Sequence, residues 1–109
     1  MTHITIQRTG GFMGRKVSAE LVLEDLPEDQ ADILEKLLVE SDFFSLPDNL
    51  ITHPVPDEFT YTITASKEDI YKTIHVSDTT TSDSLRPLLN ILIKYARTRK
   101  IEISRHPLQ

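Results

Sequence analysis

The chain has 109 residues, no cysteine and a formal net charge of −5 at pH 7, which suits one domain, residues 1–109, with its own core. Without cysteine there is no disulfide framework, thiolate metal site or cysteine nucleophile. The negative charge argues against nucleic acid as a partner, because binding to phosphate backbones depends on clustered Lys and Arg.

Membrane insertion and export are not expected either. No segment approaches the roughly 20 apolar residues of a membrane span. The N-terminal MTHITIQRT has no basic stretch followed by an apolar run. We therefore expect a cytoplasmic protein without a membrane partner.

The first two predicted elements are strands. HITIQR (3–8) and KVSAELVLE (16–24) alternate apolar and polar residues, which is the period of a half-buried strand. The segment between them, TGGFMGRK (9–16), is then the turn of a hairpin.

A helix is predicted next, in LPEDQADILEKLLVESDFF (26–44). Its apolar residues recur at spacings of three and four, Pro27 suits a first helical position, and Glu28 suits the positive N-terminal end. FFSL (43–46) follows as a hydrophobic plug. PDNLITHPVPD (47–57) has three prolines and no periodicity, which indicates a stiff surface connection.

The second half of the chain repeats the pattern. EFTYTITAS (58–66) and IYKTIHVS (70–77) alternate as strands around the turn SKED (66–69), and a helix is predicted in TTSDSLRPLLNILIKYARTRK (80–100). Residues 101–103 alternate Ile, Glu and Ile, which would fit a short closing strand.

These elements predict an α+β fold, a two-layer sandwich in the order ββαββα with a possible short C-terminal strand. A four-stranded antiparallel sheet made of two hairpins would be packed on one face by the two helices. The other face would carry threonine, serine, lysine and glutamate in contact with water.

Recognisable catalytic motifs are missing from the sequence. GGFMG (10–14) is followed by a strand and not by a helix, so it is no dinucleotide-binding fingerprint. His75 with Asp78, or with Asp57, is the pair left for a base and its orienting acid, and we interpret it as surface decoration. We expect no enzyme, no metal site and no cofactor.

The loop between the first two strands is the unusual feature. It holds all three glycines of the chain beside a phenylalanine and a methionine. One interpretation is that the glycines supply positive φ angles for a wide turn while Phe12 folds back onto the core. The other is that a hairpin tip with two apolar anchors enters a partner's cleft. The binding residues predicted on the second interpretation are Gly10, Gly11, Phe12, Met13, Gly14 and Arg15.

A second contact is predicted in the proline-stiffened segment that precedes the third strand. Its residues are His53, Pro54, Val55, Pro56 and Asp57. Rigidity before binding favours affinity, because less conformational entropy is lost on docking. Asp57 has an alternative role in pinning the turn.

Several stretches together resemble the emfourin family. They are TGGFMGRK (9–16), the acidic helix with its plug (26–47), PDEFTYTIT (56–64) and HVSDTTTSDSLRPLLNIL (75–92), and the resemblance runs from Ile4 to about Ile93. It implies a small bacterial protein inhibitor that occupies the active-site cleft of a thermolysin-like, protealysin-like zinc metalloprotease. We expect a monomer when free and a one-to-one complex with the protease.

The resemblance leaves the mode of blocking open. Phe12 or Met13 would fill the apolar pocket of such a protease, which is a steric block. A zinc contact through His3, His53 or Asp57 is the alternative. A different class of function also stays open, a non-catalytic interaction or regulatory module that uses the threonine-rich sheet face or the acidic helix.

Overall fold

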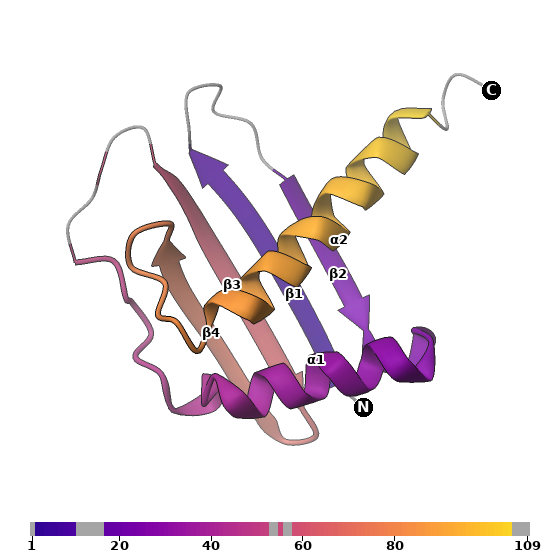
Figure 1. Ribbon diagram of the computed structural model, residues 1–109, viewed down its shortest axis with the longest axis horizontal. Coiled ribbons are helices and arrows are strands. Elements are labelled where there is room, and N and C mark those ends of the chain that lie inside the picture. The colour runs from indigo at the N-terminus through magenta and orange to yellow at the C-terminus, as the bar shows by residue number, and fades with distance from the viewer. Residues whose placement is uncertain (1, 11–16, 53–54, 56–57, 106–109) are drawn as a thin grey trace.

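The computed structural model describes residues 2–10, 17–52, 55 and 58–105 (Figure 1). The elements in chain order are β1 (Thr2–Gly10), β2 (Val17–Val22), the short 3-10 helix η1 (Leu23–Asp25), α1 (Glu28–Glu40), the 3-10 helix η2 (Phe43–Ser45), β3 (Phe59–Lys67), β4 (Ile70–Ser77) and α2 (Arg86–Arg105). This is the predicted ββαββα order.

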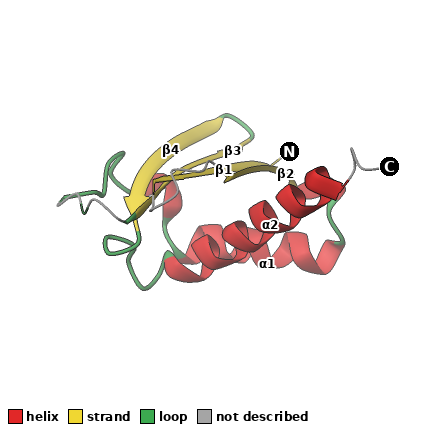
Figure 2. Ribbon diagram, turned by 90° about the horizontal axis from the view of Figure 1, so that it is seen from above, coloured by secondary structure: helices red, strands yellow, loops and turns green. Residues whose placement is uncertain are grey.

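The four strands form one antiparallel sheet with the order β2-β1-β3-β4. Figure 2 shows the sheet as one layer and both α-helices as the other. In Figure 1, α1 runs across the end of the sheet where β1 begins, and α2 crosses the sheet diagonally. The predicted two-layer α+β sandwich is confirmed.

β1 is a central strand, and its two neighbours pair with it over different lengths. β3 pairs with all of β1, from Thr2↔Lys67 to Gly10↔Phe59. Among the described residues, the pairing with β2 runs from His3↔Val22 to Arg8↔Val17. The described partner of the last residues of β1, Thr9 and Gly10, is β3.

Both helices present leucines to the sheet. In α1, Leu34 and Leu38 are buried, whereas Ile33 is 49% exposed, so the buried stripe is narrower than its sequence spacing predicts. Pro27 lies just before the helix and not at its first position. None of the described helices is long and apolar enough to cross a membrane.

The predicted apolar face of α2 is confirmed. Its buried residues, with one residue just before the helix, are Leu85, Leu88, Leu89, Leu92 and Ala96. The short closing strand is wrong, because residues 101–103 belong to the last turns of α2. Three alternating residues are too few to define a strand, and lengthening an existing helix adds a hydrogen bond for each residue that is fixed.

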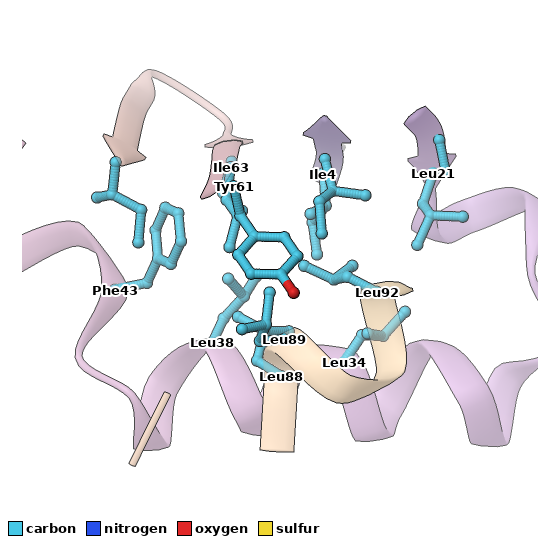
Figure 3. Packing of buried hydrophobic residues seen from close by; sticks show 14 of the residues in the cluster. Ile4, Leu21, Leu34, Leu38, Phe43, Tyr61, Ile63, Leu88, Leu89 and Leu92 are labelled. Carbon is cyan, nitrogen blue, oxygen red and sulfur yellow. The ribbon is translucent and has the colours of Figure 1, made fainter. Parts of the chain in front are cut away.

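The core fills the space between the layers (Figure 3). The Tyr61 ring points from β3 toward the leucines of both helices, and Phe43 enters from η2. Phe43 is fully buried and meets Phe44 edge to face, with ring centroids 5.7 Å apart. The predicted hydrophobic plug is confirmed for Phe43, while Phe44 is half-buried.

The other sheet face is polar, as the alternation predicted. Hydroxyl groups pair across neighbouring strands, with 2.9 Å between Thr9 Oγ1 and Thr60 Oγ1 and 2.8 Å between Thr64 Oγ1 and Thr73 Oγ1. Such cross-strand pairs add modest stability to a solvated face. No described element covers this face.

Part of the connection from η2 to β3 is more regular than predicted. His75 N–H donates to the Asp48 carbonyl and Leu50 N–H donates to the His75 carbonyl, both at 2.8 Å. Residues 48–50 thereby shield part of the outer edge of β4, a position where an exposed strand would otherwise invite pairing with another chain.

An ion pair at the β3–β4 turn predicts acid sensitivity. Lys67 Nζ lies 2.8 Å from Glu35 Oε2, and this bond lowers the pKa of the Glu35 carboxyl from its ordinary value of 4.5. A pKa that is lower in the folded state stabilises the fold above the unfolded value, and this contribution is lost as the pH falls through the folded pKa. The urea concentration at the unfolding midpoint should therefore decrease as the pH falls below the ordinary glutamate pKa of 4.5.

The matched comparison is between two glutamates of α1. Glu35→Gln should flatten the pH dependence of the urea midpoint over this range, whereas Glu40→Gln, at an exposed position without the Lys67 contact, should leave it in place. Equal slopes in the two variants would contradict the role of the ion pair.

Candidate functional site

Gly10 and Val55 are the predicted contact residues that the structure describes. The other predicted contact residues lie outside the described part of the chain, and their roles stay predictions: Gly11, Phe12, Met13, Gly14, Arg15, His53, Pro54, Pro56 and Asp57.

Gly10 ends β1 in a conformation that favours glycine. Its φ is +90°, in the region that L side chains rarely adopt. A Cβ at this position would lie 2.9 Å from the Glu58 carbonyl oxygen, which is backbone and cannot swing away. The positive φ predicted for these glycines is confirmed at Gly10. The backbone that approaches it closely is the chain's own.

The close approach of Gly10 and Glu58 brings together the residues at which the two predicted contact segments meet the sheet. Gly10 leads into the glycine-rich loop, and Glu58 directly follows the proline-stiffened segment. Gly10 pairs with Phe59, the first residue of β3, at the end of the sheet away from α1 (Figure 1). Glu58 N–H donates to the Val55 carbonyl at 3.1 Å, and the Val55 side chain is 48% exposed. Gly10 and Glu58, the described residues next to the two segments, therefore lie side by side.

Arg8 packs against the start of β3. Its guanidinium carbon lies 4.3 Å from the centroid of the Phe59 ring, within the range of a cation–π contact. Arg8 has the same strand parity as Ile4 and Ile6, so it lies on the helix-facing side of the sheet, opposite Tyr61. Arg8 was not among the predicted contact residues, although its position on the helix-facing side follows from its spacing to Ile4 and Ile6 in the sequence.

Tyr61 and the segment after β4 form a second set of contacts nearby. The Tyr61 hydroxyl donates to Asp78 Oδ1 at 2.6 Å, and Arg86 Nη2 donates to the Asp78 carbonyl at 2.7 Å. Burial, with the hydrogen bond to the Asp78 carboxylate, raises the pKa of Tyr61, which keeps its hydroxyl protonated. Tyr61 is thus a fixed donor that ties β3 to the approach of α2.

Glu58 connects the same segment to the start of β3. Its Oε1 accepts the Thr79 N–H, and Asp78 N–H donates to the Phe59 carbonyl at 3.3 Å. The hydrogen bond from Thr79 lowers the pKa of the Glu58 carboxyl. The Glu58 carboxylate therefore ties the start of β3 to the segment after β4, while its backbone carbonyl approaches Gly10.

His75 and Asp78, one of the two pairs considered for catalysis, do not contact each other. His75 Nδ1 lies 3.1 Å from Thr62 Oγ1 on the polar sheet face. Asp78 contacts Tyr61, whose side chain lies on the helix-facing side. The sheet separates the two groups, so Asp78 does not orient His75.

His3 lies away from Gly10, at the other end of β1. It pairs with Val22 and Ser66 near the start of β1, seven residues from Gly10, or about 23 Å along an extended strand. Within the described residues, no three His, Asp or Glu side chains are grouped so that they could hold a metal ion. That His3 could be a fourth ligand of the protease's zinc stays a prediction, and it would approach that metal from the end of β1 distant from Gly10.

Two hollows on the described surface lie away from Gly10. One, of about 340 Å³, runs between α1 and α2 and is lined by Gln30, Ile33, Leu34, Ile91, Lys94 and Tyr95. The other, of about 480 Å³, lies over β2, β1 and β3 on the polar face and is lined mainly by hydroxyl, amide and carboxylate side chains. Neither brings together an acid, a base and a nucleophile.

Comparison with known proteins identifies the family to which the chain belongs. The family model Emfourin matches residues 6–92. Among solved structures, emfourin (M4in) from Serratia proteamaculans, described as an M4 family peptidase inhibitor, is 18% identical, with a TM-score of 0.46 over 80% of this chain and 84% of that chain. No curated protein sequence matches the chain. The match of the family model to most of the chain shows that it belongs to the emfourin family.

Proposed function

We propose that the chain is a non-enzymatic protein inhibitor of a thermolysin-like zinc metalloprotease. The observation that carries the proposal is the family-model match over residues 6–92. The predicted partner follows from what the family resemblance implies, and the glycine-rich loop is our candidate for the inhibitory element.

The loop enters the active-site cleft and blocks it sterically. Phe12 or Met13 fills the apolar pocket of the protease, and the glycines let the backbone lie close to the walls of the cleft. Residues 53–57 make a second contact beside it. The support for this part comes from Gly10 and Glu58, which bring the ends of both segments to one corner of the sheet.

The inhibitor resists cleavage because the entry of the loop is held by the sheet. β1 stays paired with β3 as far as Gly10, the last residue before the loop that the structure describes. A bound loop with anchored ends cannot easily adopt the geometry for attack or release its products. The alternative to the steric block is a contact with the protease's zinc through His3, His53 or Asp57.

An inhibition assay tests the proposal. The purified chain is titrated against a thermolysin-like protease and against an unrelated zinc protease, and peptide hydrolysis is followed. Inhibition of the first with a one-to-one endpoint, and no effect on the second, is the expected result. Unchanged hydrolysis by several thermolysin-like proteases would overturn the proposal and favour the interaction module.

A further inference from the structure

β2 forms one outer side of the sheet, and no described strand pairs with it there. The strand order β2-β1-β3-β4 gives Val17–Val22 a neighbour on one side only. The opposite outer side of the sheet, on β4, is partly shielded by residues 48–50. Within the part of the chain that the structure describes, no backbone hydrogen bond reaches β2 from outside its pair with β1. We call the side of β2 that faces away from β1 the β2 edge.

The register shows which backbone groups face the β2 edge. In an antiparallel sheet, both backbone groups of a residue point to one side, and successive residues point to opposite sides. The N–H and C=O of His75 bond outside the sheet, so its partner Thr62 points to β1 and bonds Gln7 there. Gln7 thus points to β3, and Ser18, which lies opposite Gln7, points away from β1. Glu20 is two residues further on and points the same way.

The side chains near the β2 edge favour a partner segment with basic residues. Glu20 is exposed on the polar face of the sheet. A hollow of about 420 Å³ lies just after the end of β2, and its lining includes Glu24, Glu28 and Asp32, all exposed, together with apolar side chains. Such a lining suits the apolar stem and the cationic head of a lysine or an arginine. An acidic segment would be repelled.

The helix layer and the net charge argue against a second copy of the chain at the β2 edge. α2 packs against β2 and continues past it (Figure 1). Residues directly opposite each other in paired strands share a face, so a second copy paired antiparallel with β2 would bring its own helix layer to the side where the end of α2 lies. It would also bring a second net charge of −5. A single extended segment of another protein avoids both conflicts.

We propose that an extended segment of the target protease adds to the four-stranded sheet as a fifth strand, hydrogen-bonded to the backbone of Ser18 and Glu20. This inference rests on the proposed function and assigns it a docking surface. Proteases hold substrate chains through backbone hydrogen bonds, so the walls of their clefts carry backbone groups that can pair with a strand edge. In strand addition the main-chain bonds give affinity, and side chains at alternate positions give specificity. Here the specificity is for a basic side chain beside Glu20.

Hydrogen exchange followed by NMR tests the proposal on the unaltered chain. In the free chain, the N–H groups of Ser18 and Glu20 should exchange quickly, whereas those of Ala19 and Leu21, which point to β1, should exchange slowly. In the complex with a thermolysin-like protease that the chain inhibits, exchange at Ser18 and Glu20 should slow at least about tenfold. Unchanged exchange at both residues in an inhibited complex would overturn the strand addition and leave the proposed function standing.

Proline substitution tests the backbone of the β2 edge directly. Glu20→Pro removes the N–H that faces the partner but no bond to β1, and edge strands tolerate proline at such positions. It should raise the inhibition constant about tenfold, the effect of about one hydrogen bond. Glu20→Ala keeps the N–H and removes only an exposed charge, so the inhibition constant should rise about threefold at most. Equal effects of the two substitutions would overturn the backbone pairing.

Thr73→Pro is the matched control on the opposite outer strand. Thr73 is two residues from His75, so its N–H also points out of the sheet. Its replacement should leave the inhibition constant unchanged. A rise equal to that of Glu20→Pro would show a general effect of proline on the sheet and would overturn the assignment to β2.

Two further outcomes decide the identity of the partner. Slower exchange at Ser18 and Glu20 in the chain alone, increasing with its concentration and accompanied by a dimer mass in sedimentation, would overturn the protease segment in favour of a second copy. If the unaltered chain inhibits no thermolysin-like protease, the proposed function fails, and the assignment of the added strand to the protease fails with it.

Discussion

Replacing Phe12 by alanine is expected to raise the inhibition constant against the target protease about 30-fold or more, which corresponds to ~2 kcal/mol. The reason is chemical, since a large apolar side chain between small residues of a hairpin loop can anchor in a partner's pocket. Alanine removes the anchor and leaves the strands that carry the loop. The melting temperature should change by no more than about 2 °C, because a side chain outside the core adds little to stability.

Tyr71→Ala is the matched control for this substitution. Tyr71 is an aromatic residue of β4 that is 73% exposed, close to the β3–β4 turn at the other end of the sheet. Its removal should leave inhibition unchanged. If Phe12→Ala lowers the melting temperature while inhibition persists, the ring packs on the core, and the cleft-entering loop is wrong.

Replacing Phe43 by alanine is expected to lower the free energy of unfolding by ~3–5 kcal/mol. The ring is fully buried, in an element that packs on β4 and α1, and alanine would leave a cavity that the surrounding core residues can fill only in part. Urea unfolding followed by circular dichroism measures the change. A large fraction of the stability of a domain of this size depends on this one residue.

Phe44→Ala is the comparison, since Phe44 is half-buried and adjacent in sequence. Phe44→Ala should lower the free energy of unfolding clearly less than Phe43→Ala does, because less apolar surface is removed from the core. Equal losses in the two variants would contradict the distinction between buried and half-buried rings in η2. At temperatures where Phe43→Ala is still folded, its inhibition constant should match that of the unaltered chain.

The periodicity of the sequence predicted which residues face the core. Tyr61, Ile63 and Ala65 alternate with threonines and are all buried on the helix-facing side. The order of the strands in the sheet could not be predicted in the same way, because a period of two identifies which face a residue is on but not which strand lies beside it. The pairing of β1 with β3, which places Gly10 beside Phe59, depends on contacts distant in the chain.

The candidate site could be predicted only in part. The glycines marked a turn with positive φ, and Gly10 has this conformation. The approach of Glu58 to Gly10 could not be inferred, because it follows from the β1–β3 register. The contact of Arg8 was not predicted, because a charged residue is expected to face water although Arg8 shares the parity of Ile6. Its long side chain reaches Phe59 instead.

The central place of β1 has a consequence for how the chain is made. β1 is synthesised first, yet one of its two partners, β3, begins only at residue 59. Closing this long loop costs chain entropy before its contacts form, which is typical of slow-folding topologies. During synthesis, the edge of β1 that pairs with β3 therefore has no partner until residues 59–67 have been made.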